Sequence, residues 1–515
     1  MHRCWQMPEL TGTIFEQIDN PDRDWFSLAR TCRTFSDPAL DLLWRRQESI
    51  VPLLKCLPPD AWREVEEEQD STSHFSAPRE FRFCRPLQLA DWDRVLLYSR
   101  RIRRFDEDPE TYSAWGFTHI GHDVVEVLFM SFPTQPVLPM VQTMSTFTES
   151  PLFPSLRFFH GQYLTTLNVT IDDLDYRLSG LAYLTSCPSL RHLRLIHTYD
   201  GNEDIVDPVS SYIRAAVTDL ESVLVPLLNQ SALEHLAGLP HLHTLEVTQL
   251  RAKPFPNIHA IQDSFFPNLH KLTLNPRRIS LAGNFLAAVR SSPLLSLSVT
   301  VQETALRVDY ATFMAVLPNH KSLTSVAIDT RGGVQLIRGF DIDATPYIVE
   351  SADIRPLLEL SNLEDLHLYT LVGFSFDDNF GILMSLAWPR LKALRLLPNF
   401  GHKFATPPPM PTMAFLMTLA SNCPRLQALY LDIDTSNVSE QYALRSRVRQ
   451  TALTSLVFYR KTYVSEPVTM AKLLSSLFPS LRVISAVKDQ EKWALVRKQV
   501  ATFAAIRAEE REFML

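Results

Sequence analysis

One short pattern recurs along most of the chain from about residue 160 onward. It reads Pro-x-Leu-x-x-Leu-x-Leu, in which Val, Ile or Phe can replace any Leu. Clear copies are Cys-Pro-Ser-Leu-Arg-His-Leu-Arg-Leu, ending at Leu195, and Trp-Pro-Arg-Leu-Lys-Ala-Leu-Arg-Leu, ending at Leu396. The leading leucines of all copies are at positions 164, 190, 220, 242, 269, 294, 323, 363, 391, 426, 453 and 481. Self-similarity with a mean period of about 29 residues is typical of a solenoid of stacked supersecondary units.

Each copy predicts a strand, because apolar and polar residues alternate within it. In residues 190–195, Leu193 and Leu195 point to one face of the strand and His192 and Arg194 to the other. The residues between copies, such as 413–420 and 470–477, have the apolar spacing of amphipathic helices. A proline then ends each helix and sets the extended start of the next strand. The predicted fold class is α/β, with parallel strands inside and helices outside.

This pattern resembles the leucine-rich-repeat family over roughly residues 155–487. It departs from the family at the position three residues after the last Leu of the motif, where the family has Asn or Cys and this chain has Thr198, Leu250 and Arg277. The side-chain ladder that regularises such horseshoes is therefore expected to be absent. Because the spacing of the copies varies from 22 to 40 residues, we expect an irregular arc with loops, with the longest step between Leu323 and Leu363.

Residues 7–46 predict a compact unit of three helices. Ile14, Phe15 and Ile18 are placed on one face of the first helix, and Asn20-Pro21 starts the second. Asp37-Pro38 is interpreted as the N-cap and first residue of the third helix. A unit this short cannot bury enough surface to be stable alone, so it must pack against the rest of the chain or against a partner.

This unit resembles an F-box. The residues that carry the resemblance are Met7-Pro8-Glu9, Ile14-Phe15, Phe26-Ser27-Leu28-Ala29 with Cys32 and Phe35, and Leu43-Trp44. The family's leading Leu is Met7 here, which keeps the apolar character. The resemblance implies that the unit docks a Skp-family adaptor, which joins the chain to a cullin–RING ubiquitin ligase. The residues implied for this contact or its immediate support are Pro8, Leu10, Ile14, Phe15, Leu28, Cys32 and Phe35.

The predicted organisation has four parts. An F-box occupies residues 1–50, a linker and N-terminal cap 51–155, a solenoid of about twelve irregular repeats 156–487, and a capping helix 488–515. The acidic run at 64–70, followed by Ser and Thr, predicts a mobile acidic loop at 64–78. The inner stripe predicted for the capping helix consists of Trp493, Val496, Val500, Phe503 and Ile506.

A helix with one basic face is predicted near residues 92–105. Its apolar positions are Trp92, Val95, Leu96, Ile102 and Phe105, and its basic positions are Arg94, Arg100, Arg101, Arg103 and Arg104. The basic face is interpreted first as a solvated helix face. A nuclear-import signal or a contact for an acidic partner are the alternatives.

Composition and motifs argue against catalysis. The 515 residues include only 14 Gly, and the chain has no His-Glu-x-x-His, P-loop, dinucleotide-binding glycine fingerprint or nucleophile elbow. Six scattered Cys suggest reduced intracellular thiols. Two histidine groups, His235/His241/His243 and His119/His122 with Asp123, lack the spacing of zinc motifs and are interpreted as surface or loop residues. We therefore expect no enzyme activity, cofactor or metal.

The cellular setting and partners follow from similar exclusions. The sequence has no run of 18 apolar residues and no secretory leader pattern at its start, so we expect no membrane span and a cytoplasmic or nuclear location. A net charge of −7 argues against general nucleic-acid binding. What remains is a surface for protein partners.

The outward positions of the predicted strands are the candidates for that surface. They mix both charge signs, and therefore single out no ligand class. The client-binding candidates are His192, Arg194, Glu246, Lys271, Asp365, His367, Arg395 and Tyr430, beside Thr244 and Thr273. Binding at loops or at the C-terminal end is the alternative.

Two functions remain open. The first is a substrate-recognition subunit of an SCF-type ubiquitin ligase, whose F-box binds the adaptor and whose solenoid binds an unknown client. The second is a ligase-independent scaffold or inhibitor, in which the N-terminal helices only cap the solenoid.

Overall fold

The structure of the chain is a computed structural model. The structure describes residues 7–18, 21–66, 79–107, 118–171, 187–197, 204–216, 219–251, 265–332, 345–398, 409–436, 438, 448–459 and 462–514. The chain divides into two compact units, residues 1–242 and 243–515, and each is described by itself.

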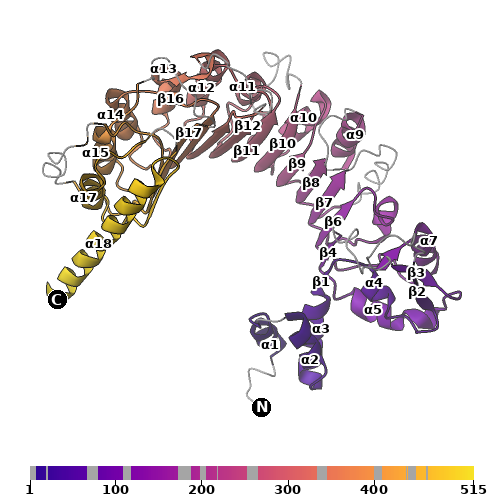
Figure 1. The fold of residues 1–515 in the computed structure, drawn as a ribbon. Helices are drawn as coiled ribbons and strands as arrows, with labels where there is room; N and C mark the ends of the chain where they lie inside the picture. Colours follow the sequence, from indigo (N-terminus) through magenta and orange to yellow (C-terminus); the bar gives the residue numbers. More distant parts are fainter. Residues whose placement is uncertain are drawn as a thin grey trace, which may run out of the picture. The chain divides into compact units, whose positions relative to one another are not determined.

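A parallel sheet of fifteen strands is the central feature of the described residues, and the strands follow one another in chain order (Figure 1). This confirms the predicted α/β class, since helices alternate with the strands. The strands are β1 (Arg46–Gln47), β4 (Arg104–Asp106), β6 (Thr143–Phe147), β7 (Thr166–Ile171), β8 (His192–His197), β9 (Ser222–Val225), β10 (Thr244–Leu250), β11 (Lys271–Pro276), β12 (Ser296–Thr300), β13 (Ser325–Asp329), β15 (Asp365–Thr370), β17 (Ala393–Pro398), β18 (Ala428–Tyr430), β19 (Ser455–Phe458) and β20 (Val483–Ala486).

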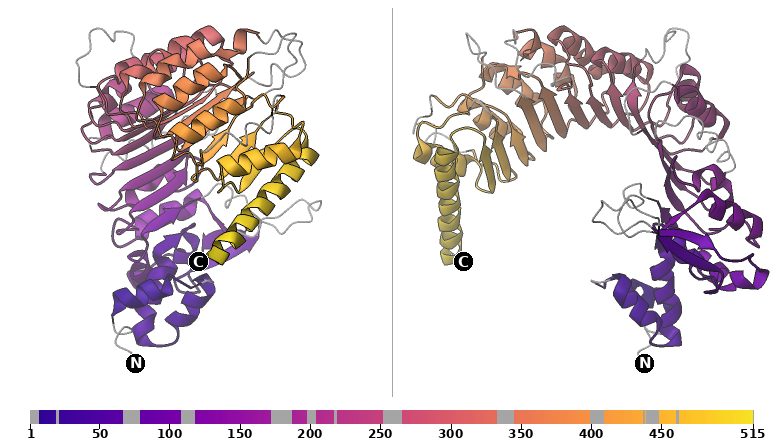
Figure 2. Two further views of the ribbon diagram at one scale, coloured as in Figure 1. Left: turned by 90° about the vertical axis from the view of Figure 1, so that its left-hand side faces the viewer. Right: turned by 45° about the vertical axis from the view of Figure 1, so that its right-hand side comes forward.

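Helices lie along one side of the strands within each unit (Figures 1 and 2). The longer ones in residues 51–242 are α7 (His122–Ser131), α9 (Val206–Ala216) and α10 (Gln230–Ala237). Those in residues 243–515 are α11 (Ile279–Ala288), α12 (Arg307–Met314), α13 (Ser351–Ile354), α14 (Asp378–Ala387), α15 (Met413–Asn422), α17 (Pro467–Leu477) and α18 (Gln490–Met514). The helices predicted at 413–420 and 470–477 are thus α15 and α17. No helix among the described residues combines the length and apolar character needed to cross a membrane.

The repeat leucines form ladders in the core of residues 243–515. Strand register aligns the second leucine of each copy with that of the next, in the order Leu245, Leu272, Leu297, Val326, Leu366, Leu394, Leu429, Leu456 and Ile484. All of these side chains are buried. Full burial of such a side chain contributes about 1.5–3 kcal/mol, so the ladder specifies the register as well as the stability of the sheet.

The junction prolines act as predicted. Helices α14 and α15 end at Ala387 and Asn422, and each is followed by one capping residue and then a proline, Pro389 or Pro424. Because the residue before proline disfavours helical geometry, the chain leaves the helix there and turns toward the next strand.

Other side chains bridge successive repeats where the family's ladder residues are missing. Each donates a hydrogen bond to a backbone carbonyl of the preceding repeat. Trp388 Nε1 donates to Leu357 O at 3.1 Å, and Gln450 Nε2 donates to Leu426 O at 2.7 Å. Similar bonds run from His320 to Leu286 O and from Ser292 to Phe265 O. Because these residues differ in type from repeat to repeat, no fixed motif marks them in the sequence.

Three helices form the N-terminal part, as predicted: α1 (Pro8–Phe15), α2 (Pro21–Ala29) and α3 (Arg33–Arg45). Two predicted details are wrong. Helix α1 ends at Phe15, so Ile18 lies in the following turn. Helix α3 begins at Arg33 rather than at Pro38, because the Ser36 N–H donates to Cys32 O at 3.0 Å and closes a first turn upstream. Pro38 is buried inside the helix, where it lacks the N–H that would bond to the carbonyl four residues earlier.

The residues predicted as linker and cap contain strands of the main sheet. β4 and β6 lie within residues 51–155, and β4 pairs in parallel with β1, which lies at the end of the range predicted as the F-box. A separate small sheet consists of β2 (Trp62–Glu66), β3 (Arg79–Phe83) and β5 (Thr118–Ile120). Of the predicted acidic loop at 64–78, residues 64–66 belong to β2, and 67–78 lie outside the described residues.

The basic helix predicted for residues 92–105 is wrong beyond Ser99. The helix α5 spans Asp93–Ser99, and Arg104–Asp106 is strand β4. Phe105 is buried as part of β4, and Ile102 is buried in the segment just before that strand, so neither belongs to a helical face. A three-residue strand has too few positions to show alternation, and the apolar residues of 92–105 happen to be spaced as in a helix.

A helix, α18, is present at Gln490–Met514, where a capping helix is predicted. Trp493, Val496 and Val500 are buried, whereas Ile506 is 46% exposed. The predicted inner stripe therefore ends near Phe503, which is half-buried.

Candidate functional site

The helices α1–α3 have a small aromatic core. The Phe15 side chain is buried and meets the Phe35 ring edge-on, with ring centroids 5.5 Å apart. Trp25 Nε1 on α2 donates to the Phe15 carbonyl at 2.9 Å, which joins the end of α1 to α2. Phe15 therefore supports the unit from inside, while Phe35 is half-buried.

Several large apolar side chains of the same unit remain exposed. Leu10 and Ile14 are 45% and 41% exposed, and they share one face of α1 because they are four residues apart. Leu28 and Cys32 are half-buried, and Pro8 begins α1. The contact residues taken from the resemblance omit Met7 and Phe26, which are 51% and 53% exposed.

Side-chain contacts join α3 to the residues that follow it. Trp44 stacks on Tyr98 of α5, with centroids 4.7 Å apart and an interplanar angle of 13°. Arg101 pairs with Asp37 at 2.7 Å and also with Asp41, both on α3. Arg104, on β4, pairs instead with Asp106. The predicted basic face therefore does not exist as one surface, because its arginines serve different contacts.

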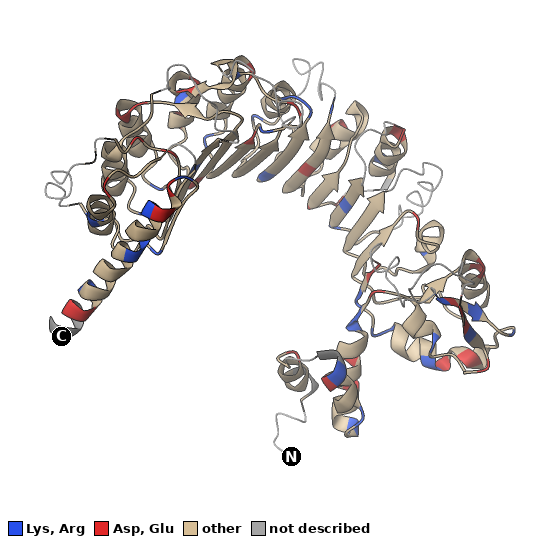
Figure 3. Ribbon diagram, in the orientation of Figure 1, with Lys and Arg blue, Asp and Glu red and all other residues tan. Residues whose placement is uncertain are grey.

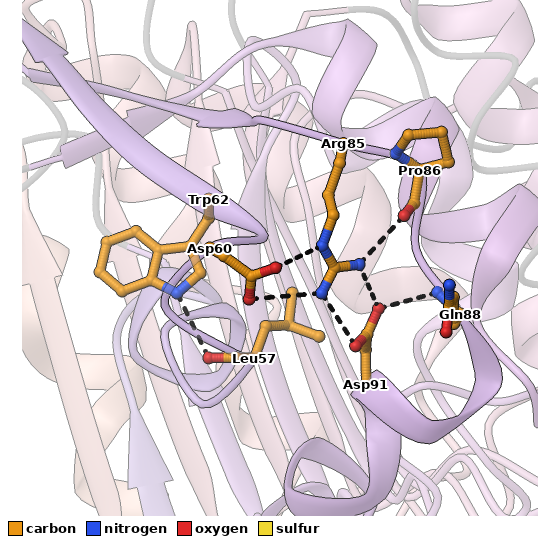
Figure 4. A network of polar contacts seen from close by, with 7 residues as sticks. All are labelled: Leu57, Asp60, Trp62, Arg85, Pro86, Gln88 and Asp91. Atoms are coloured by element: carbon orange, nitrogen blue, oxygen red, sulfur yellow. Dashed lines mark hydrogen bonds and ion pairs between the residues drawn. The ribbon is translucent and has the colours of Figure 1, made fainter.

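A polar network around Arg85 organises the loop that precedes α5 (Figure 4). The Arg85 guanidinium bonds to Asp60 at 2.7 Å and to Asp91 at 2.7 Å, and also donates to the Pro86 carbonyl. Two hydrogen bonds lower the pKa of the Asp91 carboxyl to about 2: the larger effect comes from the Arg85 guanidinium and the smaller from the Gln88 backbone N–H. Asp91 belongs to the 3-10 turn Leu89–Trp92, where it also forms a capping box with Gln88. This network has a structural role, since its charges are already paired.

Two titratable side chains, Glu107 and Cys187, are buried in the interior. Glu107, directly after β4, accepts hydrogen bonds from Thr146 Oγ1 at 2.7 Å and Ser150 Oγ at 3.0 Å. Burial raises the pKa of its carboxyl to about 7. Burial likewise raises the pKa of the Cys187 thiol to about 12, which makes it unsuited to act as a nucleophile.

The outward strand positions follow the predicted alternation. In β8 and β11 the leucines are buried, while His192, Arg194 and Lys271 are exposed. Charged residues on the strands are sparse and of both signs (Figure 3). His192 and Arg194 belong to residues 1–242, and the other six client-binding candidates to residues 243–515.

Only some of these candidates are neighbours. His367, Arg395 and Tyr430 occupy one register row on β15, β17 and β18. Asp365 lies two register positions earlier on β15, opposite Ala393. Glu246 is opposite Thr273 and Lys271 opposite Thr244, several strands away from that row.

The His367–Arg395–Tyr430 row is held by specific contacts. The Arg395 guanidinium lies over the Tyr430 ring, 4.9 Å from its centroid, and donates to His367 Nε2. Burial and then the Arg395 charge lower the pKa of His367, while Asp365 opposes them. The His367 imidazole is therefore neutral in this arrangement, and it accepts a hydrogen bond from the Arg395 guanidinium.

A second arginine–tyrosine pair was missed by the sequence analysis. Arg331, after β13, lies over the Tyr369 ring at 4.5 Å, and its guanidinium bonds to both oxygens of Asp329. Tyr369 sits on the outward side of β15 and could have been found by extending the alternation by one step. Arg331 follows its strand, so no periodicity points to it.

Among the residues that the structure describes, no group of three or more His, Cys, Asp or Glu could hold a metal ion. His243 of the first predicted histidine group stacks on His270, with centroids 5.4 Å apart. His119 and His122 of the second group lie in β5 and at the start of α7.

Comparison with known proteins adds no family. No protein-family model matches the sequence, and the search of curated proteins finds no match.

Proposed function

We propose that this chain is the substrate-recognition subunit of an SCF-type ubiquitin ligase. In this proposal α1–α3 bind a Skp-family adaptor, and the outward face of the repeat sheet binds the client. The observation that carries the proposal is the exposure of Met7, Leu10, Ile14 and Phe26 on one unit of about forty residues. Large apolar side chains gathered on so small a unit indicate a protein contact surface. The resemblance of this unit to an F-box names the partner.

The chain would then act by positioning. The ubiquitin-transfer chemistry belongs to other chains of the ligase, and this chain holds the client where its lysines can be reached. The contacts between Trp44 and Tyr98 and between Arg101 and α3 support this role, because they limit the motion of the docking helices relative to the following residues.

The alternative is a ligase-independent scaffold or inhibitor whose N-terminal helices cap the sheet. The same contacts of α3 with Tyr98 and Arg101 favour it, since they also protect the first strands. This alternative predicts that deletion of residues 1–46 unfolds the neighbouring sheet cooperatively and that no adaptor binds.

The double variant Leu10→Glu/Ile14→Glu should weaken adaptor binding by about 100-fold or more. Burial of each of these side chains in the complex contributes about 1.5–3 kcal/mol to binding. The substitution removes this contribution, and binding must in addition desolvate two carboxylates. Both side chains are exposed, so α1–α3 should stay folded; Phe15→Ala would instead remove part of the aromatic core. Binding is measured by co-purification with, and titration of, the adaptor.

The matched control is Val127→Glu/Met130→Glu on α7, whose side chains are 37% and 89% exposed. It adds the same charges to another helix face and should bind the adaptor like wild type. Circular dichroism checks that all variants keep their helix content. If the wild-type chain brings down no adaptor, the proposed function is wrong.

A further inference from the structure

Two arginine–tyrosine stacks face outward from the sheet of residues 243–515. In one, Arg331 lies over Tyr369; in the other, Arg395 lies over Tyr430. Arginine and tyrosine are, with tryptophan, enriched at energetically important positions of protein interfaces. The two stacks have the same chemistry, so any difference in their surroundings is informative.

The stacks differ in how the positive charge is balanced. Arg331 is ion-paired with Asp329 at 2.5 Å. Arg395 makes no ion pair with any carboxylate of the described residues, and its polar partner is the ring of His367. That imidazole is neutral where it accepts from the guanidinium, so it positions the arginine without cancelling its charge. Asp365 lies two register positions earlier, opposite Ala393, and forms no ion pair with Arg395.

Three alanines flank the His367–Arg395–Tyr430 row in the sheet. Ala393 and Ala428 lie opposite each other in the preceding row of β17 and β18, next to Arg395 and Tyr430. On the far side of His367, the same register row continues with Ala327 of β13. Ala393 is buried and Ala428 is half-buried, so a side chain from a partner could approach Arg395 beside Ala428. The Tyr430 ring and His367 would fix the guanidinium from two sides.

We propose that Arg395 is the anchor for an anionic side chain of a protein client, either a carboxylate or a phosphorylated residue. A planar guanidinium held in place offers paired N–H donors that match both groups. A nucleic acid fits less well, because phosphate backbones are bound by several cations in series and this row has one. The description of the bound protein as a client rests on the proposed function; the anion site itself does not.

The test uses the full chain without any adaptor. The probes are three fluorescein-labelled decapeptide pools with randomised flanks and a central Glu, phosphoserine or Gln, followed by fluorescence anisotropy. We expect the anionic pools to bind wild type about 10-fold more tightly than the Gln pool, as for a charge-assisted hydrogen bond. The ratio of the Glu and phosphoserine pools shows which anion is preferred.

Two variants locate the effect. Arg395→Ala should abolish the preference for the anionic pools, whereas Arg331→Ala, which removes an equal charge from the paired stack, should keep it. Equal binding of all three pools by wild type would overturn the proposal, and so would an equal loss in both variants. Failure of adaptor binding would contradict the proposed function but would not affect the anion preference of Arg395, because the peptide assay contains no adaptor.

Discussion

Replacing Trp388 with alanine is expected to lower the free energy of unfolding by about 3–5 kcal/mol, as for other buried Trp-to-Ala changes. Trp388 is fully buried at the end of α14 and is among the largest such side chains described. Its ring fills the space between successive repeats, and its Nε1 donates to the Leu357 carbonyl of the repeat before. The substitution would therefore open a cavity and leave that carbonyl with the Leu360 N–H as its remaining donor.

Trp388→Phe separates these two contributions. It keeps most of the apolar ring but removes the donor, so its cost should be smaller, about 1–3 kcal/mol. Urea unfolding followed by circular dichroism measures both variants. A loss below about 1 kcal/mol for Trp388→Ala would contradict the role assigned to this residue in joining the repeats.

Glu107→Gln is expected to stabilise the chain at pH 8 by up to about 3 kcal/mol. Burial raises the pKa of Glu107 from its ordinary value of 4.5 to about 7. The folded state therefore holds the proton more tightly than the unfolded state does. The contribution of this proton to stability is fully present below about pH 4.5 and is lost as the pH rises through about 7. Glutamine keeps a neutral side chain at every pH, and the Thr146 and Ser150 hydroxyls can rotate to meet it.

The predicted signature is a gain that depends on pH. The difference between Glu107→Gln and wild type should shrink to below about 1 kcal/mol at pH 5, measured by urea unfolding at both values. The control is Glu48→Gln at an exposed carboxylate, which should change stability by less than about 0.5 kcal/mol at either pH. A gain for Glu107→Gln that is the same at pH 5 and pH 8 would show that Glu107 does not titrate as described.

The sheet could be predicted from sequence because its information is local. The alternation of apolar and polar residues within six positions decides which face of a strand is buried. Because this pattern recurs after each leading leucine, it can be recognised in the sequence. Short strands such as β4 escaped prediction, since three residues cannot display a period. Helix α3 starts upstream of Pro38 because packing and a turn at Cys32 outweigh the local preference of proline for a first helical position.

The candidate site was predictable only in part. Alternation placed His367, Arg395 and Tyr430 on the outward face of their strands, but nothing local says that they touch. Their contacts span 28 residues from His367 to Arg395 in the chain, and depend on register between strands. The same holds for the bridges from Trp388 and Gln450, whose partners lie in the preceding repeat. Charge pairing is equally non-local, which is why Arg331 and Arg395 differ in role despite similar stacks.

The central claim is tested most directly by mixing the purified chain with a purified Skp-family adaptor and measuring the mass of the product. Size-exclusion chromatography with light scattering should show a 1:1 complex, heavier than the 58.8 kDa chain by the mass of one adaptor. The Leu10→Glu/Ile14→Glu variant should elute as the free chain under the same conditions. Separate elution of the wild-type chain and the adaptor at micromolar concentration would contradict the assignment of α1–α3 as the docking unit.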